Sequence, residues 1–255
     1  MPEHLPRASI RYIGHATVLT DLAGVKLLTD PLLRSRVAHL RRAGKVDPGA
    51  PRGVDAVLIS HLHYDHLDMA SLQRLGKDMP VVAPHGAGAL IRRKAGIANV
   101  LEMRPGEQIE IGAVTVRATR AAHDPGRLPF GVRAEPLGYV IHGDNRSVYF
   151  AGDTDVFAGM SDLSPVDVGL LPIWGWGPTM GPGHMDPVRA AEAAGLVGAR
   201  VAIPIHWGTY YPIHLGLTGP PDFLKTPSSQ FEQAVRDFAP STEVRVLQPG
   251  EETAI

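Results

Sequence analysis

A short histidine-rich motif follows directly on an apolar stretch, and this pairing constrains the fold more than any other feature of the chain. The apolar stretch, Val-Asp-Ala-Val-Leu-Ile at 54–59, is bounded by Gly53 and by polar residues. A short apolar run of this length with β-branched residues predicts a buried strand. The motif, Ser-His-Leu-His-Tyr-Asp-His-Leu-Asp at 60–68, is therefore expected on a loop at the carboxyl end of that strand.

The motif has the residue types and the spacing of a metal site. His61 and His63 are two positions apart, so in extended backbone they point to the same side and can bind one metal ion. Asp65 and His66 lie beyond that pair, and a tight turn would direct them at a second ion beside the first. Imidazole is a good zinc ligand, and two ions about 3.5–4 Å apart can share a hydroxide in hydrolysis. The alternative, a surface histidine cluster, does not explain why the motif follows a buried-type strand.

Composition limits the class of protein. The chain has 255 residues, of which 44% are hydrophobic and 20% charged, and we expect a single domain over 1–255. A net charge of −1 argues against nucleic acid as a partner. Because the chain has no cysteine, any metal must be bound by histidine and carboxylate. The first residues contain no apolar segment of a secretion signal, so we expect a cytoplasmic protein.

The apolar pattern predicts strands and helices that alternate after the motif. Strands are expected at 9–13, 16–22, 25–29, 54–59, 81–83, 99–101, 108–111, 113–121, 136–142, 147–150, 166–171, 199–205 and 243–247. Helices are expected at 70–75, 87–94, 188–196 and 229–238. Such alternation implies parallel strands with helices packed outside them.

Three further candidate ligands follow predicted strands. His123 comes after the strand at 113–121 and is the best candidate for the third imidazole of the first metal. Asp153 follows a strand and a glycine, so its carboxylate can approach two ions closely and bridge them, although Asp155 competes for this role. His206 follows the strand at 199–205 and repeats the pattern, whereas Asp124 is interpreted as a turn residue.

Two residues near the N-terminus have open interpretations. Asp30 follows a predicted strand and either supports a metal-binding histidine or forms a turn before proline. His15 either reaches the site or caps a turn, and from the residues alone the second interpretation is favoured.

Three segments have open roles. The only basic concentration is at 32–46, with Arg34, Arg36, Arg41, Arg42 and Lys45. Its apolar spacing predicts a helix, which can bind phosphate, contact a membrane surface, form a lid or a homo-oligomer interface, or present a solvated face. The loop with Trp174 and Trp176 can wall a substrate pocket, and the proline-rich stretch 210–227 is typical of a lid.

The candidate ligands together resemble the metal centre of the metallo-β-lactamase superfamily, whose seven usual dinuclear positions can all be matched: His61, His63, Asp65, His66, His123, Asp153 and His206. The likeness covers nearly the whole chain. It implies an α/β (α+β) fold, a four-layer αβ/βα sandwich of two related halves. It also implies that the first metal is bound by His61, His63 and His123, the second by Asp65, His66 and His206, and both by Asp153.

Shorter segments resemble one branch of the superfamily, that of the ascorbate-6-phosphate lactonase and the N-acylphosphatidylethanolamine phospholipase D. They are Gly-His-Ala-Thr at 14–17, Asp-Pro at 30–31, Gly-Asp-Thr at 152–154, His-Met-Asp-Pro at 184–187 and Ile-His-Trp-Gly at 205–208. In that branch the histidine of the His-Met-Asp-Pro-like segment lies near the substrate, which implies this position for His184. The absence of cysteine argues against the β-lactamase classes that use a cysteine ligand.

These observations predict a dinuclear metal-dependent hydrolase with two zinc ions (Zn2+) per chain, or manganese (Mn2+) as the alternative. It would cleave a small ester, lactone or phosphodiester with a metal-bridging hydroxide, which Asp65 orients while His184 assists the leaving group. One alternative is a phospholipid phosphodiesterase like the N-acylphosphatidylethanolamine phospholipase D, with membrane contact through 32–46. The other is a non-catalytic metal-binding protein on the same fold.

Overall fold

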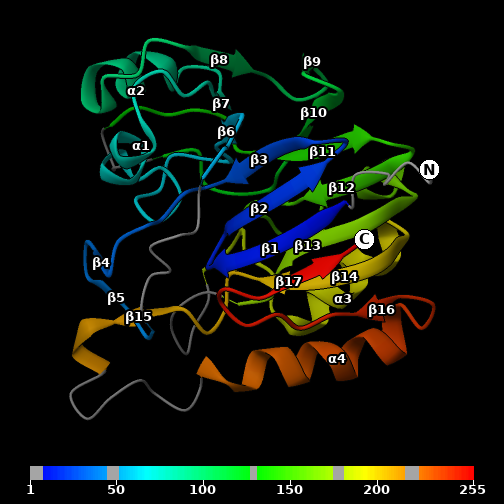
Figure 1. The fold of residues 1–255 in the computed structure, drawn as a ribbon. Helices are drawn as coiled ribbons and strands as arrows, with labels where there is room; N and C mark the ends of the chain where they lie inside the picture. Colours follow the sequence, from blue (N-terminus) through cyan, green and yellow to red (C-terminus); the bar gives the residue numbers. More distant parts are fainter. Residues whose placement is uncertain (1–7, 45–51, 127–130, 175–180, 216–223) are drawn as a thin grey trace, which may run out of the picture.

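The computed structural model describes residues 8–44, 52–126, 131–174, 181–215 and 224–255. It has two large β-sheets packed face to face with helices on their outer faces (Figure 1). The strand order is β17-β1-β2-β3-β6-β7-β8 in the first sheet and β16-β14-β13-β12-β11-β10-β9 in the second. This arrangement is the expected four-layer αβ/βα sandwich.

The strands have the following bounds. The first sheet contains β1 (Ser9–Gly14), β2 (Thr17–Leu22), β3 (Val25–Thr29), β6 (Ala56–Leu58), β7 (Val81–Pro84), β8 (Val100–Met103) and β17 (Glu252–Ala254). The second contains β9 (Gln108–Ile111), β10 (Val114–Arg120), β11 (Leu137–Gly143), β12 (Arg146–Phe150), β13 (Val166–Pro172), β14 (Ala199–Ile205) and β16 (Glu243–Val244). A small third sheet contains β4 (Arg36–Val37), β5 (Leu40–Arg42) and β15 (Tyr210–Pro212).

The helices are α1 (Met69–Leu75), α2 (Gly88–Ala95), α3 (Pro187–Leu196) and α4 (Thr226–Phe238), with short 3-10 turns at Met160–Leu163 and Ile213–Leu215. Two begin at aspartate caps beside the site. Asp68, the last residue of the histidine motif, accepts a hydrogen bond from the Ser71 backbone, and Asp186 accepts one from Arg189. Within the described residues, no helix combines the length and the apolar character needed to cross a lipid bilayer.

The two large sheets share one plan. In the first, β1, β2 and β3 are antiparallel neighbours, and β3, β6, β7 and β8 are parallel neighbours. In the second, β9 to β12 are antiparallel, and β12, β13, β14 and β16 are parallel. The chain thus builds the same half twice, as the resemblance implies.

Successive residues of the central strands point into different layers. In β12, Val148 and Phe150 lie between the sheets, whereas Tyr149 packs in the cluster that includes α3 and α4 residues. In β3, Leu27 and Leu28 divide in the same way, with Leu28 on the side of α1 and α2. Both faces of these strands are therefore buried, which explains why they are apolar along their length.

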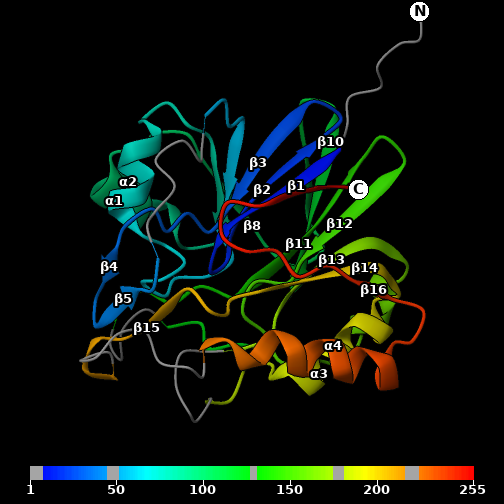
Figure 2. The same cartoon turned by 60° about the horizontal axis from the view of Figure 1, so that its bottom comes forward.

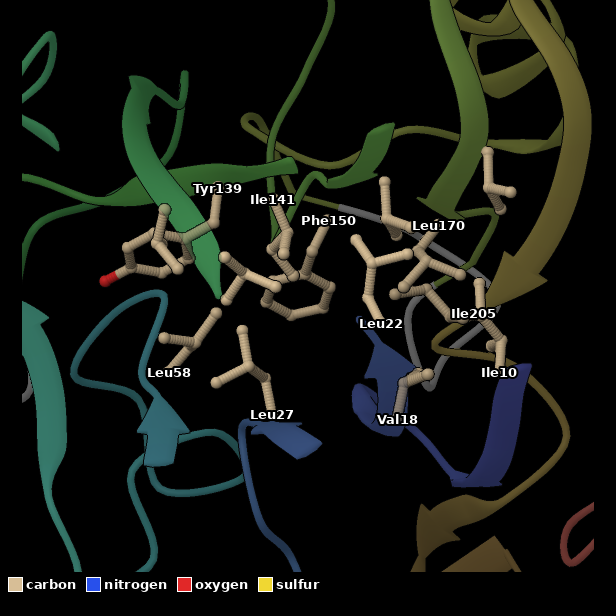
Figure 3. Close-up of a cluster of buried hydrophobic side chains, with 14 of the residues drawn as sticks. Ile10, Val18, Leu22, Leu27, Leu58, Tyr139, Ile141, Phe150, Leu170 and Ile205 are labelled. Carbon is tan, nitrogen blue, oxygen red and sulfur yellow. The ribbon is translucent and has the colours of Figure 1, made fainter. Parts of the chain in front are cut away.

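The layer between the sheets fixes the strand that precedes the histidine motif. Leu58 of β6 and Leu27 of β3 face Tyr139 and Phe150 of the second sheet (Figure 3), and all four side chains are fully buried. The hydroxyl of Tyr139 also donates a hydrogen bond of 2.7 Å to the carbonyl oxygen of Ile59. The backbone at the start of the motif is thus anchored to the opposite sheet.

The expected helix at 32–46 is wrong, because residues 36–42 form the hairpin β4–β5. Val37 and Leu40 have a spacing that suits a helix, but they lie opposite each other in the hairpin and are both buried. The expected lid from 210 is also wrong at its start, since Tyr210 pairs with Arg42 in the third sheet. Figures 1 and 2 show this sheet as a group apart from the two large ones. Residues 45–51 and 216–223 lie outside the described residues.

Candidate metal centre

Strands that run in the same direction bring the candidate residues to one edge of the sandwich. β3 is parallel to β6, and β12, β13 and β14 are parallel to one another. β2 is antiparallel to both β1 and β3, so β1 runs in the same direction as β3. In the same way β11 is antiparallel to both β10 and β12, so β10 runs in the same direction as β12. The residues that follow are His15 after β1, Asp30 after β3, the motif 60–68 after β6, His123 after β10, Asp153 after β12 and His206 after β14.

Three imidazoles converge in the first cluster. Nδ1 of His63 lies 3.0 Å from Nε2 of His61 and 3.1 Å from Nε2 of His123. The His61 ring is completely buried, and the other two rings are partly exposed. Three ring nitrogens at one point match the donor set of catalytic zinc sites, in which a further position is left for water or substrate.

The second cluster contains Asp65, His66 and His206. Nε2 of His66 is 3.2 Å from Nε2 of His206, and Oδ2 of Asp65 lies 3.8 Å from each of these nitrogens. Both histidines are buried, whereas the Asp65 side chain is 13% exposed. The structure therefore brings together two nitrogen donors and one carboxylate donor beside the first cluster.

The carboxylate of Asp153 lies between the two clusters. Its Oδ2 is 3.2 Å from Nε2 of His66 and 4.0 Å from Nε2 of His61, and its Oδ1 is 3.4 Å from Nε2 of His206. The preceding Gly152 has a φ of 61°, and a Cβ there would lie 2.6 Å from a side-chain carbon of the motif. Glycine is thus required for this close approach.

One atom of Asp153 shows that the site suits cations. Its Oδ1 is buried and has no hydrogen-bond partner among the described residues. A buried carboxylate oxygen without a donor costs free energy unless a cation compensates it. Together with the imidazoles and the second carboxylate, it forms a donor set of the kind that zinc and manganese accept. The residues present therefore fit metal ions.

Hydrogen bonds at the outer nitrogens orient four of the histidines. In each ring Nδ1 faces an oxygen acceptor, so in the neutral form of the ring Nε2 directs its lone pair at the centre. The acceptors are Oδ2 of Asp30 for His66 (2.7 Å), Oγ of Ser60 for His61 (2.9 Å), the carbonyl oxygen of Gly183 for His123 (2.8 Å) and the carbonyl oxygen of Trp174 for His206 (2.6 Å). The structure thus sets the tautomer that metal binding requires.

Asp30 joins two of these hydrogen bonds. Its carboxylate accepts from the backbone N–H of Ser60 at 2.7 Å and from the Ser60 hydroxyl at 2.5 Å, in addition to His66. The same hydroxyl oxygen accepts from His61. Asp30 is fully buried and orients one histidine in each cluster. Of the two open interpretations of Asp30, the structure therefore favours support of the site.

His15 lies in the second cluster, and its interpretation as only a turn cap is wrong. Its Nε2 is 3.0 Å from Oδ2 of Asp65, and its ring centroid is 3.9 Å from that of His206. The Tyr12 hydroxyl accepts a hydrogen bond of 3.0 Å from its backbone N–H and thereby anchors this turn. The sequence gives no local signal for this contact, because the partners lie 50 and 191 positions away.

Burial controls the titration of the first cluster. It lowers the pKa of His123 to about 4 and the pKa of His61 well below its ordinary value. Burial also lowers the pKa of His15 to about 3. These rings are therefore neutral at pH 7, which is the form of imidazole that binds metal.

His66 differs from these rings because carboxylates surround it. Burial alone would lower its pKa, but the charges of Asp153 and Asp65 and the hydrogen bond to Asp30 raise the pKa well above its ordinary value. For the carboxylate of Asp153 the effects have the opposite sign. Burial alone would raise its pKa, but the nearby His206 and His66 hold that pKa well below the usual range. A metal cation that binds beside these carboxylates must displace the proton of His66.

A cavity of about 400 Å³ opens onto the two clusters. The hairpin β4–β5 forms its apolar wall with Val37, Ala38 and Leu40. The polar side includes His63, Asp65, Asp153 and His184. A cavity of this size suits a small molecule.

His184 faces this cavity beside the first cluster. Its Nε2 lies 3.6 Å from Oδ2 of Asp153, and its ring centroid is 4.6 Å from that of His123. Its Nδ1 donates to the carbonyl oxygen of Gly181 at 3.2 Å, and its side chain is 27% exposed. This placement allows contact with a substrate, and it also allows His184 to bind a metal ion together with His123 and Asp153.

The remaining candidates lie elsewhere. Oδ1 of Asp155 accepts from Nε of Arg189 at 2.5 Å, at the start of α3. Asp124 accepts from a backbone N–H two residues on, as expected of a turn residue. Trp174 packs against the cluster under α3 and α4 and is not among the residues that line this cavity, and Trp176 lies outside the described residues, so their role as a pocket wall stays a prediction.

Known proteins resemble this chain over most of its length. Residues 26–207 match the family model described as "Beta-lactamase superfamily domain". The UPF0173 metal-dependent hydrolase of Methanopyrus kandleri is 32% identical over 252 residues, which are 95% of this chain and 97% of that protein. The N-acyl-phosphatidylethanolamine-hydrolyzing phospholipase D 1 of Caenorhabditis elegans is 34% identical over 226 residues, which are 78% of this chain and 63% of that protein. A metallo hydrolase from Ignicoccus hospitalis has the same fold, with a TM-score of 0.71, 24% identity and coverage of 97% of this chain and 98% of that one.

Proposed function

The chain belongs to the beta-lactamase superfamily and is a metal-dependent hydrolase, and on that premise we propose that it uses two zinc ions to cleave a small ester, lactone or phosphodiester. The position of Asp153 carries this proposal. One carboxylate lies within 4.0 Å of donors from both clusters, and its Oδ1 has no other partner among the described residues. A single ion would leave part of this donor set unused.

The residues would divide between two ions. His61, His63 and His123 would hold one, Asp65, His66 and His206 the other, and Asp153 both. When bound, the ions would supply a hydroxide nucleophile near neutral pH and polarise the scissile oxygen. Manganese is the alternative metal, because sites of histidine and carboxylate accept both.

Two residues of the chain have separate proposed roles beside the metals. Asp65, which His15 holds in place, orients the attacking hydroxide, because its carboxylate can accept a hydrogen bond from that hydroxide. His184 faces the substrate and donates to the leaving oxygen. Because its Nδ1 proton is directed at Gly181, this donation requires a ring that also carries a proton on Nε2.

The cavity supports a small substrate with an apolar part. The hairpin wall supplies Val37 and Leu40, while the metal-site residues lie on the polar side. An ester or lactone would place its carbonyl at the polar side and its hydrocarbon part against the hairpin.

A phospholipid phosphodiesterase is the second candidate. The relative from Caenorhabditis elegans is named for hydrolysis of N-acyl-phosphatidylethanolamine, and the apolar cavity wall suits an acyl chain. The chain spans 63% of the length of that relative, so its activity is a second candidate rather than the first.

A turnover assay of the zinc-loaded protein separates these candidates. The substrates are a lactone panel, p-nitrophenyl esters, bis-p-nitrophenyl phosphate and vesicles that contain N-acylphosphatidylethanolamine. We expect hydrolysis of a soluble ester, lactone or phosphodiester that stops with a chelator, returns with zinc and is lost in His61→Ala. Turnover of the phospholipid alone would favour the second candidate, and no turnover by fully loaded protein would contradict both.

A further inference from the structure

A groove lined by arginines lies on the other side of the hairpin β4–β5 from the metal-site cavity. Its volume is about 1030 Å³. Its lining includes Arg34, Arg36, Arg41, Arg42 and Arg74. Among the described residues, no acidic side chain lines it. The groove therefore presents a concentration of positive charge that the proposed hydrolytic site does not use.

Two of these arginines repel each other across the hairpin. Arg36 and Arg41 are directly opposite in the register of β4 and β5, and both are exposed. In the described part of the chain, neither guanidinium group has an ion-pair or hydrogen-bond partner, although the backbones of both residues pair in the sheet. Like charges in directly opposite positions destabilise a strand pair. An anion between the two guanidinium groups would convert this repulsion into attraction.

A third arginine is a buried cation without a carboxylate partner among the described residues. Arg42 is 5% exposed; its Nη2 donates to the carbonyl oxygen of Ile13 at 2.5 Å, and its Nη1 to the hydroxyl of Tyr210 at 3.4 Å. Both acceptors are neutral, and burial of an uncompensated charge is costly. Gly14 makes room for the group, since a Cβ there would lie 2.6 Å from Nη2. The fold therefore builds a definite place for this cation.

The two remaining arginines are held in position. Nε and Nη2 of Arg34 donate to the Asp68 carboxylate at 2.9 and 2.6 Å, and Nη1 of Arg74 donates to the carbonyl oxygen of Leu33 at 2.5 Å. Among the described residues, one carboxylate, that of Asp68, thus offsets the five guanidinium groups. Because Arg34, Arg42 and Arg74 are already held by these contacts, only Arg36 and Arg41 would lose side-chain freedom when an anion binds the groove.

We propose that this groove binds a phosphate group, carried by a soluble phosphate ester or by a lipid headgroup. The planar forks of guanidinium groups match phosphate oxygens, and several of them converge here. Phosphate between Arg36 and Arg41 would also stabilise the hairpin whose other residues, Val37 and Leu40, wall the metal-site cavity. The site does not depend on metal, so it can be tested independently of the hydrolytic function.

Calorimetric titration of the zinc-loaded protein with inorganic phosphate tests this site. The variant Arg36→Gln/Arg41→Gln removes the opposed pair, and Arg93→Gln/Lys94→Gln removes the same charge from the exposed face of α2. We expect phosphate binding at the groove to weaken at least about tenfold in the first variant and to stay unchanged in the second. Any phosphate that binds at the metal centre would bind there equally in all three proteins, so the difference between variants reports the groove.

Thermal unfolding gives an independent readout. Phosphate should raise the melting temperature of the wild type and of the α2 control, but not that of Arg36→Gln/Arg41→Gln. The single variant Arg36→Glu should melt higher than the wild type in phosphate-free buffer, because the introduced carboxylate pairs with Arg41, and it should also lose the response to phosphate. This single variant keeps the test decisive if Arg36→Gln/Arg41→Gln folds poorly.

Vesicle sedimentation distinguishes the two sources of phosphate. Groove-dependent binding to phosphatidylglycerol vesicles but not to phosphatidylcholine vesicles assigns the site to a lipid headgroup, whereas groove-dependent binding of inorganic phosphate without vesicle binding assigns it to a soluble ester. Equal phosphate affinity and equal vesicle binding in the wild type and in Arg36→Gln/Arg41→Gln would overturn the proposal.

Discussion

Oδ2 of Asp30 lies 2.7 Å from Nδ1 of His66, and both side chains are completely buried. Through the Ser60 hydroxyl the same carboxylate also orients His61, so one residue outside the candidate donor set acts on both clusters. A carboxylate at this position fixes the tautomer of the ring and makes its other nitrogen a better ligand.

Asp30→Asn should therefore weaken zinc binding by about 10–100-fold. The amide has one oxygen where the carboxylate has two, and its NH2 group would face donors. Competition with a chromophoric chelator measures the affinity. Asp55→Asn is the matched control, because Asp55 is exposed, precedes β6 at the end opposite to the histidine motif, and among the described residues its carboxylate accepts only from the backbone N–H of Lys26. Equal zinc affinity in both variants would show that Asp30 is merely a turn residue.

His15→Asn should lower kcat about tenfold while both ions are retained. Asparagine tolerates the positive φ of 62° at this position, but its shorter side chain cannot hold Asp65 as the imidazole does. The measurement pairs kcat with metal content on one preparation. Loss of one ion would contradict this expectation and identify His15 as a ligand.

Asp153→Ala should lower metal content at both clusters and abolish turnover, because its carboxylate lies between them. Asp155→Ala should change neither, since that carboxylate is bound to Arg189. Elemental analysis and a turnover assay of the two variants test this contrast. Similar losses in both would show that the loop is fragile or that the bridging aspartate is wrongly chosen.

His184→Ala should keep both metals and the melting temperature of the wild type but lower kcat by about 10²–10³, or roughly 2.7–4 kcal/mol, as expected when one donor to the transition state is removed. His85→Ala, a change at an exposed histidine outside the donor set, is the control. Metal loss in His184→Ala would make this residue a ligand, and normal kcat with a lower melting temperature would make it structural.

The parts of the site that could be predicted from sequence are those with local signals. His61, His63, Asp65 and His66 lie within six positions behind a buried strand. His123, Asp153 and His206 each follow a predicted strand, and the common direction of these strands brings them to one edge. Short apolar runs such as 54–59 and 166–171 likewise make the central strands of both sheets predictable.

The errors arose where the partner is distant in sequence. His15 contacts Asp65 and His206, and nothing around position 15 indicates either contact. The apolar spacing at 32–46 suits a helix, whereas residues 36–42 form a hairpin whose pairing with Tyr210 cannot be inferred locally. Asp30 stayed ambiguous for the same reason, since a turn and a bond to His66 look alike in the sequence.

The number of metal ions per chain tests the central claim most directly. Protein stripped with a chelator is titrated with zinc, and the bound metal is measured by elemental analysis after removal of excess ions. Donors from both clusters around Asp153 predict about two zinc ions per chain, with His61→Ala and His206→Ala each retaining fewer than the wild type. A reproducible stoichiometry of one ion or less in the fully reconstituted wild type would contradict the dinuclear account.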